Sequence, residues 1–160
     1  MKVFRIEREK YLNTTLSGIG ASMDDGNRWN SRFTRLVYTA ESRALALLEV
    51  AVHLDLSEDL PTDRFLVEIE IPDDEMVQEI QQDFLPIDWN EYPPTSSTQA
   101  IGDDFVQKNA ALLLRVPSCL VPDEFNYLIN PHHADIQRVQ VCKTVAMGLD
   151  SRLGGIGRTC

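Results

Sequence analysis

The pattern of apolar and polar positions predicts several strands. Apolar and polar residues alternate, or apolar residues run together, in four stretches that we expect to be strands: 2–6, 64–71, 110–116 and 137–146. In the first of these, alternation places Arg5 on the same face as Val3. Polar residues on one face of a strand are usually solvated, so the glutamates of the second strand are expected to face solvent.

A helix rich in apolar residues is predicted after a short β-type run at 36–38. Apolar side chains cover most of its surface, so we expect it to be largely buried. Ser42 is a suitable N-cap for this helix, with Thr39 as the competing choice. Two further helices are predicted, one over 98–108 and a short acidic one that begins at 72–75 (PDDE) and continues over 76–80.

Length and composition favour one soluble domain. The chain has 160 residues, of which 43% are hydrophobic and 25% charged, which suits a single globular core. No apolar run approaches the ~20 residues of a membrane span, and the first residues lack the apolar stretch of a signal peptide. The three cysteines form an odd set without metal-ligand spacing. We therefore expect reduced thiols and a cytoplasmic protein that does not contact a membrane.

The net charge is −10, with a pI near 4.7. This acidity argues against direct nucleic-acid binding, because affinity for the phosphate backbone comes mainly from Lys and Arg. A few arginines can still line a pocket for an anionic small molecule. The acidity itself has two interpretations, solubility alone or attraction of a protein partner with a basic patch.

Glu49 lies inside the apolar helix, and a carboxylate there requires an explanation because an unpaired buried charge is costly. It belongs to a structural ion pair, or it lies on an exposed edge of the helix, or it faces a cleft together with Arg28 and Tyr38. Arg28 follows Gly26 and precedes Trp29, where a planar guanidinium can stack or bind phosphate in a bidentate manner. Trp29 itself is expected in the core.

Other chemistries lack their motifs. The sequence has no G-x-S-x-G nucleophile elbow, no P-loop and no G-x-G-x-x-G, so a serine hydrolase, a nucleoside triphosphatase and a Rossmann enzyme are not supported. The adjacent His132 and His133 have no third histidine nearby and no H-E-x-x-H motif. We therefore expect no metal site and a structural role for these histidines.

Two long sequence blocks carry a resemblance to a known family. The first reads GNRWN and continues through VYTAESRALALLEVAVHL, and the second reads PSCLVPDEFNYLINPHH. Together they resemble the RES domain, named for its Arg, Glu and Ser, and long blocks are more specific than a short motif. The resemblance predicts a RES domain over residues 1–153. The glycine-rich segment 154–160 departs from the family pattern and is expected to be a disordered tail.

The resemblance implies a fold and a function. The fold is expected to be α+β, a single domain with an ADP-ribosyltransferase-like core of two small packed sheets and surrounding helices. The implied function is a toxin of a type II toxin–antitoxin pair that cleaves the nicotinamide–ribose bond of its substrate NAD, with water or phosphate as acceptor and no cofactor. Alternatives are mono-ADP-ribosylation of a protein and a non-catalytic module that only binds a partner. Retention of all four family side chains counts against the last; these are Arg28, Tyr38, Glu49 and Ser118.

The resemblance also implies roles for individual residues. Glu49 would stabilise the cation that develops on the ribose, by analogy with glycosidases. Arg28 would anchor phosphate, Tyr38 would pack on nicotinamide or ribose, and Ser118 would hydrogen-bond the substrate. Two further residues are expected near NAD, namely Asn30, which also could brace its loop, and Arg5, as a secondary phosphate contact.

The implied partner is an Xre-like antitoxin that blocks the active site. Self-association is also plausible, and the loop residues Trp89 and Tyr92 are the only features of the sequence that support it. These two aromatic side chains could instead form a lid, contact a partner, or pack against the domain. Packing is the expected outcome.

Overall fold

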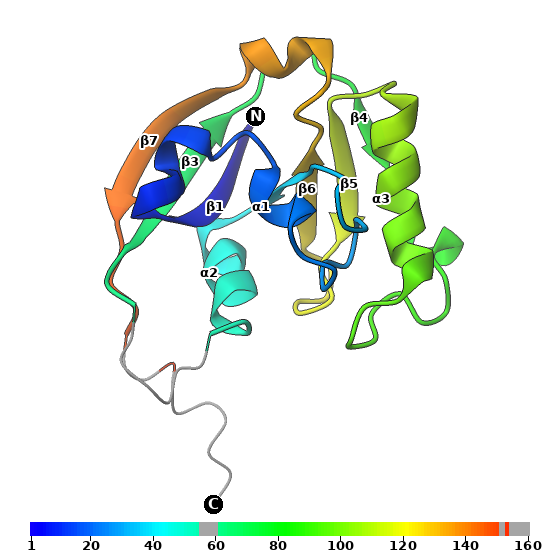
Figure 1. The fold of residues 1–160 in the computed structure, drawn as a ribbon, viewed down its shortest axis with the longest axis horizontal. Helices are drawn as coiled ribbons and strands as arrows, with labels where there is room; N and C mark the ends of the chain where they lie inside the picture. Colours follow the sequence, from blue (N-terminus) through cyan, green and yellow to red (C-terminus); the bar gives the residue numbers. More distant parts are fainter. Residues whose placement is uncertain (55–60, 151–152, 154–160) are drawn as a thin grey trace, which may run out of the picture.

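The computed structural model describes residues 1–54, 61–150 and 153, and Figure 1 shows its architecture. The strands are β1 (Lys2–Arg8), β2 (Val37–Ala40), β3 (Arg64–Glu70), β4 (Val77–Glu79), β5 (Leu113–Pro117), β6 (Phe125–Ile129) and β7 (Gln140–Ala146). The α-helices are α1 (Ile19–Ser22), α2 (Arg43–Ala51) and α3 (Ser96–Lys108), and the 3-10 helices are η1 (Glu9–Thr14), η2 (Gln82–Phe84) and η3 (Ala134–Arg138). The expected disordered tail, 154–160, lies outside the described residues.

The described strands form one seven-stranded sheet in the order β4-β5-β6-β2-β1-β3-β7. Strands β4 and β5 are parallel and all other neighbours are antiparallel. The predicted single domain of mixed α and β structure is confirmed. One detail differs, because hydrogen bonding joins the two expected sheets into one. Their junction is narrow: within the described residues, β1 and β2 are paired at one position, Phe4 with Ala40.

Helices α2 and α3 cover one face of the sheet. Leu45 of α2 packs on Phe4 of β1, and Phe105 of α3 packs in a cluster with Leu114 and Leu128 of the central strands. The opposite face carries another cluster, which includes Val3, Val67 and Ile129 and is partly covered by the segment around η1. Figure 1 shows α2 and α3 beside different halves of the sheet. Helix α2 covers the narrow junction of the sheet, because Phe4 and Ala40 both belong to its cluster.

The structure confirms the predicted start of α2 but not its burial. Ser42 is the N-cap, and its Oγ accepts a hydrogen bond from the backbone N–H of Leu45 at 3.0 Å. The prediction that this helix is largely buried was wrong, because Ala44 and Val52 are exposed. Only one side of α2 contacts the sheet, so its apolar composition exceeds what packing requires.

The predicted acidic helix at 72–80 does not form. Residues 77–79 are instead strand β4, which pairs in parallel with β5. The acidic residues before it make tertiary contacts, since Asp74 and Glu75 each lie 2.6 Å from the guanidinium of Arg138. Backbone pairing with a strand distant in sequence outweighed the local helical signal.

The prediction of solvated glutamates on β3 was also wrong for Glu68. This side chain is buried, and its carboxylate lies 2.5 Å from Lys2 Nζ and 2.6 Å from a guanidinium nitrogen of Arg43. Hydrogen bonds from these two cations lower the pKa of Glu68 to about 2. Glu68 thus connects β1, β3 and α2 through ion pairs.

None of the helices in the described part of the chain has the length and apolar character needed to cross a membrane. The predicted core position of Trp29 is confirmed, since 2% of this side chain is exposed. Of the two aromatic residues in the loop before α3, Trp89 packs against the core cluster of α3, whereas Tyr92 is exposed. The expectation that the aromatic residues pack down therefore holds for Trp89 and not for Tyr92.

Candidate active site

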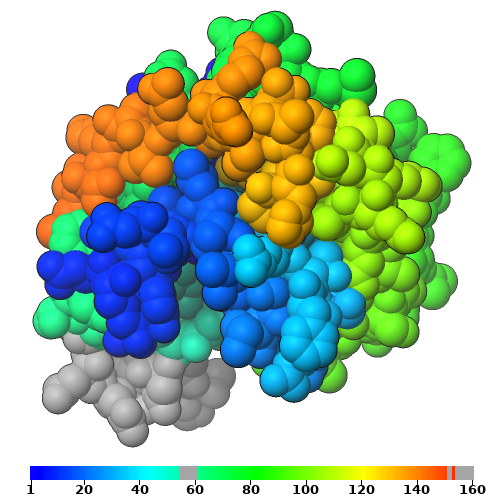
Figure 2. Space-filling view, turned by 45° about the horizontal axis from the view of Figure 1, so that its top comes forward, coloured from blue at the N-terminus to red at the C-terminus, as the bar shows by residue number. Residues whose placement is uncertain are grey.

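Helix α3 holds the segment between α1 and β2, which carries Arg28. Gln99 donates hydrogen bonds to two backbone carbonyls of this segment, at 2.9 and 3.0 Å. Asp103 accepts from the backbone N–H of Ser31 at 3.0 Å and from its hydroxyl at 2.6 Å. Between them, Gly102 lies so close that a Cβ there would be 1.6 Å from the carbonyl oxygen of Trp29. Figure 2 shows this segment in blue beside α3 in yellow-green.

Asn30 braces the segment between α1 and β2 through buried hydrogen bonds. Its side chain is fully buried, and its amide nitrogen donates to three backbone carbonyls at 3.0–3.1 Å. Its Oδ1 accepts a hydrogen bond from the Tyr38 hydroxyl at 2.7 Å, and that hydroxyl also accepts from the backbone N–H of Trp29 at 3.1 Å. Both polar atoms of the Asn30 side chain are therefore bonded to the protein. Its geometry fits the bracing role rather than contact with a substrate.

Arg28 contacts the loop before α3. Its Nη1 donates to the backbone carbonyls of Trp89 at 2.5 Å and Glu91 at 2.9 Å. Arg28 forms no ion pair with another described residue. Its partners are neutral, so its positive charge stays uncompensated and one edge of the guanidinium remains for an anion.

Glu49 is likewise held by neutral groups. Its Oε1 accepts hydrogen bonds from the amide nitrogen of Asn126 at 2.6 Å and from the hydroxyl of Ser118 at 3.2 Å. Among the described residues no cation pairs with Glu49, so the structural ion-pair interpretation fails. The carboxylate is oriented by one donor on β6 and one donor that directly follows β5.

Ser118 is placed by the end of β5, as the sequence predicts. Its side chain is buried, and its Oγ accepts hydrogen bonds from the backbone N–H groups of Leu120 at 3.1 Å and Val121 at 3.3 Å. The hydroxyl proton points to Glu49. With its lone pairs and its proton engaged, Ser118 orients the carboxylate and has no free group for a nucleophilic attack.

The charges of Arg28 and Glu49 both act on Tyr38. Burial is the main reason that the pKa of Tyr38 is raised, and the hydrogen bond with the backbone of Trp29 opposes this shift. The charges of Asp103 and Glu49 raise the pKa further, and the charge of Arg28 lowers it. Arg28 and Glu49 therefore each lie within electrostatic range of Tyr38. Tyr38 remains neutral at physiological pH, with its hydroxyl bonded to Asn30 and to the backbone N–H of Trp29.

Arg5 lies on the other face of the sheet. Phe4 pairs with Ala40, and alternation along both strands turns Arg5 away from the face that carries Tyr38. Consistent with this, the partner of Arg5 on β3 is Val67, a member of the core cluster on the opposite face.

The guanidinium of Arg5 is bonded to its own surroundings. One nitrogen donates to the carbonyl of Thr15 at 2.9 Å, and another lies 2.8 Å from the carboxylate of Glu7. Burial lowers the pKa of Arg5, and Glu7 opposes this shift. The structure therefore separates Arg5 from the other site candidates and gives it an ion-pair partner.

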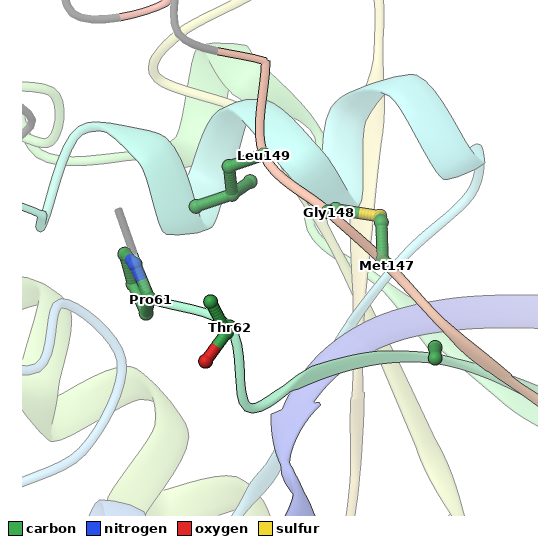
Figure 3. A pocket seen from close by; sticks show the side chains of 6 residues that line it. Pro61, Thr62, Met147, Gly148 and Leu149 are labelled. Carbon is green, nitrogen blue, oxygen red and sulfur yellow. The ribbon is translucent and has the colours of Figure 1, made fainter. Parts of the chain in front are cut away.

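Two surface hollows offer no competing site. Figure 3 shows the one lined by Pro61, Thr62, Ala146, Met147, Gly148 and Leu149, none of which has an ionisable side chain. The second is lined by Glu79, Ile80, Gln81 and Phe84. Neither lining includes any of the candidate site residues Arg28, Tyr38, Glu49, Ser118 and Asn126. Within the described ranges, no three His, Cys, Asp or Glu side chains come together as a metal site would require.

Sequence reasoning missed Asn126, Gln99 and Asp103. Asn126 stands in the second family block, but the 125–129 stretch was not predicted as a strand, so its orientation toward Glu49 was not foreseen. Gln99 and Asp103 are four residues apart on α3, and that spacing places them on one face of the helix. The sequence does not show which segment that face meets.

Comparisons with known proteins point to one family. A family described as the RES domain matches residues 2–150. The chain is 41% identical to the "Prs ADP-ribosylating toxin" of Sphingobium sp. over 89% of each chain. It is 37% identical to "Toxin Res" of Photorhabdus laumondii over 96% of this chain and 97% of that protein. The crystal structure of the M. tuberculosis MbcT–MbcA toxin–antitoxin complex contains a chain with the same fold, with a TM-score of 0.73, 18% identity and coverage of 96% of this chain and 86% of that chain.

Proposed function

This chain belongs to the RES domain family, and on that basis we propose that it is the toxin of a toxin–antitoxin pair and cleaves the nicotinamide–ribose bond of NAD. The observation that carries the proposal is the Glu49 carboxylate. It is oriented by Ser118 and Asn126, has no cationic partner among the described residues, and lies in the electrostatic range of Tyr38.

The chemistry of the bond suits a single carboxylate. The C1′–N bond breaks with its electron pair going to the nicotinamide nitrogen, which was positively charged, so the leaving group departs neutral and needs no acid. The remaining ribose carries an oxocarbenium-like positive charge, as in glycoside hydrolysis. A preorganised negative charge in a partly water-excluded site stabilises that cation as it forms. Glu49 supplies this charge.

Arg28 would bind the diphosphate of NAD. Its Nη1 is bonded to two loop carbonyls, which fixes the plane of the guanidinium and leaves the other nitrogens as donors. Tyr38 would pack against nicotinamide or ribose while its hydroxyl remains on Asn30. Ser118 supports Glu49 in this proposal, rather than contacting the substrate as the family resemblance implied.

Two acceptors fit the cleavage. With water, the water oxygen bonds to C1′ of the ribose and a proton is released, which gives ADP-ribose. With phosphate, a phosphate oxygen bonds to the same carbon, which gives the 1-phosphate of ADP-ribose. A second candidate function is transfer of ADP-ribose to a protein side chain, and the relative named an ADP-ribosylating toxin favours it. All three share the cationic intermediate and the role of Glu49.

The deciding experiment incubates purified protein with NAD, with and without phosphate and with and without a cell lysate. Chromatography identifies the small products, and NAD labelled on the adenosine reports covalent attachment to protein. Free ADP-ribose or its 1-phosphate supports degradation. Labelled protein in the mixtures with lysate, together with no release of nicotinamide in buffer alone, supports transfer to a protein. Intact NAD in every mixture, with a folded protein, would refute both.

An antitoxin partner is the second part of the proposal. We expect an Xre-like protein to cover the Arg28 and Glu49 region, since an unregulated NAD-degrading enzyme would harm its host. The related fold occurs in a toxin–antitoxin complex, which supports a partner of this kind. Self-association stays a prediction, as does action in the cytoplasm, where NAD is available.

Expression in cells tests this part. Production of the chain without its partner should arrest growth and deplete NAD, and Glu49→Gln should abolish both effects at equal protein level. Growth arrest with normal NAD would point instead to modification of a protein. A complex that leaves Arg28 and Glu49 accessible to NAD would contradict occlusion by the partner.

A further inference from the structure

The carboxylate of Glu49 is held asymmetrically. Both of its hydrogen bonds, from Asn126 at 2.6 Å and Ser118 at 3.2 Å, end on Oε1. Its Oε2 accepts no hydrogen bond from the residues that the structure describes. One oxygen is therefore anchored to the sheet, and the other is available to a ligand.

We propose that Asn126 is a positioning residue for the reaction, which holds Glu49 by Oε1 so that Oε2 faces the ribose. This inference rests on the proposed NAD-cleaving function. Asn126 acts through Glu49 and need not contact the substrate.

The fold fixes where Asn126 points. It lies on β6, paired with Ala40 of β2, and alternation puts its side chain on the face that α2 covers. Leu128, two residues further along, is fully buried on that same face, so the register of β6 cannot slip without moving it out of the core. A core contact thereby sets the position of the amide.

The chemistry of an amide suits this task better than that of a charged donor. Only the nitrogen of the Asn126 side chain can donate to a carboxylate, and a bond of 2.6 Å to an ionised acceptor is of the short, charge-assisted kind. A lysine or arginine there would bind Glu49 as tightly but would cancel the charge that the ribose cation needs. A neutral donor orients the carboxylate and leaves that charge in place.

The contribution of Ser118 is separable from that of Asn126. Ser118 is fixed by two backbone N–H groups in its own turn, whereas Asn126 reaches Glu49 from the neighbouring strand. Removing the amide leaves one donor, and the carboxylate can then rotate about that single contact. We expect misorientation of the free oxygen rather than loss of the charge.

Three variants test the proposal. Asn126→Ala should lower kcat for NAD cleavage by about 10- to 100-fold with KM changed by less than twofold, because misplacing a catalytic group by about 1 Å costs up to ~10²-fold. Thr39→Val is the matched control: it removes another buried side-chain hydrogen bond, to the carbonyl of Tyr127, on the opposite face of the same strand pair. It should lose stability without losing turnover.

Asn126→Asp provides a readout that a purely structural role would not change. In this variant a protonated carboxyl at position 126 can still donate to Glu49, whereas an ionised one repels it, so two such carboxyls share one proton. The activity of this variant should therefore be retained at low pH and fall as the pH rises. We expect no such fall in the pH profile of wild type. Two other carboxylates lie beside this part of β6 and α2: Glu41 accepts a hydrogen bond from the backbone N–H of Phe125, and Glu124 accepts one from the hydroxyl of Ser42. These two groups and Tyr38 are the same in both proteins, so the difference between the two pH profiles is assigned to residues 49 and 126.

The outcomes separate this inference from the proposed function. A folded Asn126→Ala with turnover within twofold of wild type, or an Asn126→Asp with an unchanged pH profile, overturns it. Carboxyl NMR of Asn126→Asp is independent of NAD: titration of residues 49 and 126 in two separate, coupled steps is expected. If wild type leaves NAD intact but the coupled steps appear, the proposed function fails and the contact stands. If residues 49 and 126 titrate independently of each other, the contact between them is refuted.

Discussion

Charged side chains have different partners in two regions of the molecule, strands β1 and β3 on one side and the candidate site around Glu49 on the other. Charged side chains on β1 pair with one another or with residues on or directly before β3, and three such pairs are Lys2–Glu68, Arg5–Glu7 and Arg8–Asp63. Around the candidate site, Glu49 is bonded to an amide and a hydroxyl, and Arg28 to backbone carbonyls. Neither forms an ion pair with another described residue.

The difference separates charges that hold the fold together from charges that are kept for a ligand. In an ion pair the charge of each partner is compensated by the other. A carboxylate or guanidinium held only by neutral dipoles is fixed in position but electrostatically unsatisfied, which is the arrangement that binds an ionic ligand or a developing charge. Substitutions in the first region should therefore change stability, and those in the second should change activity.

Glu49→Gln gives the largest expected effect. The amide keeps the shape of the side chain but removes the charge, so NAD turnover should fall by ~10²-fold or more, as when one preorganised electrostatic group is lost. Thermal unfolding should be nearly unchanged, since no described cation is left unpaired, and stability can even rise at a functional site. Melting curves measured beside NAD consumption check both parts. A well-folded variant with wild-type turnover would remove Glu49 from the site.

Arg5→Gln is the converse case. It leaves Glu7 without its cation in a mostly buried position, and stability should fall by about 3 kcal/mol, the low end for breaking a buried pair, because both side chains keep some exposure. The KM for NAD should not change, because Arg5 lies on the opposite face from Tyr38. Denaturant unfolding and a substrate titration measure the two quantities. A raised KM with normal stability would return Arg5 to the NAD-binding set.

Gly102→Ala tests whether packing, rather than ion pairing, holds the site. A Cβ 1.6 Å from the Trp29 carbonyl oxygen forces α3 away from the segment that carries Arg28. We expect a loss of about 1–3 kcal/mol, as for overpacked cores, together with a higher KM for NAD.

The matched control is Gly20→Ala. No heavy atom lies within 4 Å of a Cβ at this position, so the same substitution should be neutral or slightly stabilising. If Gly102→Ala and Gly20→Ala unfold at the same temperature, the close approach of α3 to Trp29 does not matter for stability.

Glu68→Gln should give the smallest effect, present at neutral pH and diminishing in acid. Lys2 and Arg43 hold the pKa of Glu68 at about 2, below that of an unfolded glutamate. A lowered pKa contributes stability above the unfolded value, and this is lost as pH falls from about 4.5 toward 2. The variant should therefore melt below wild type at pH 7 and lose less stability over that acid range. Parallel curves for both proteins, or lower NAD turnover in the variant, would contradict this.

The sequence alone identified the family blocks, the strands at β1, β3, β5 and β7, and the start of α2 at Ser42. These depend on local signals, namely alternation, apolar runs and a capping side chain, which a short stretch carries by itself. It also identified Arg28, Tyr38, Glu49 and Ser118 as candidates, because long motifs keep residue types in a recognisable order.

Tertiary structure decided which groups meet. Residues 77–79 became a strand because β5 offered a backbone partner, and Glu68 became buried because Lys2 and Arg43 come together around it from β1 and α2. The same holds for the site, where Asn126 reaches Glu49 across 77 positions of sequence while Arg5 faces the opposite side of the sheet. Strand register and sheet face depend on pairing between distant segments, and no local pattern of residues encodes that pairing.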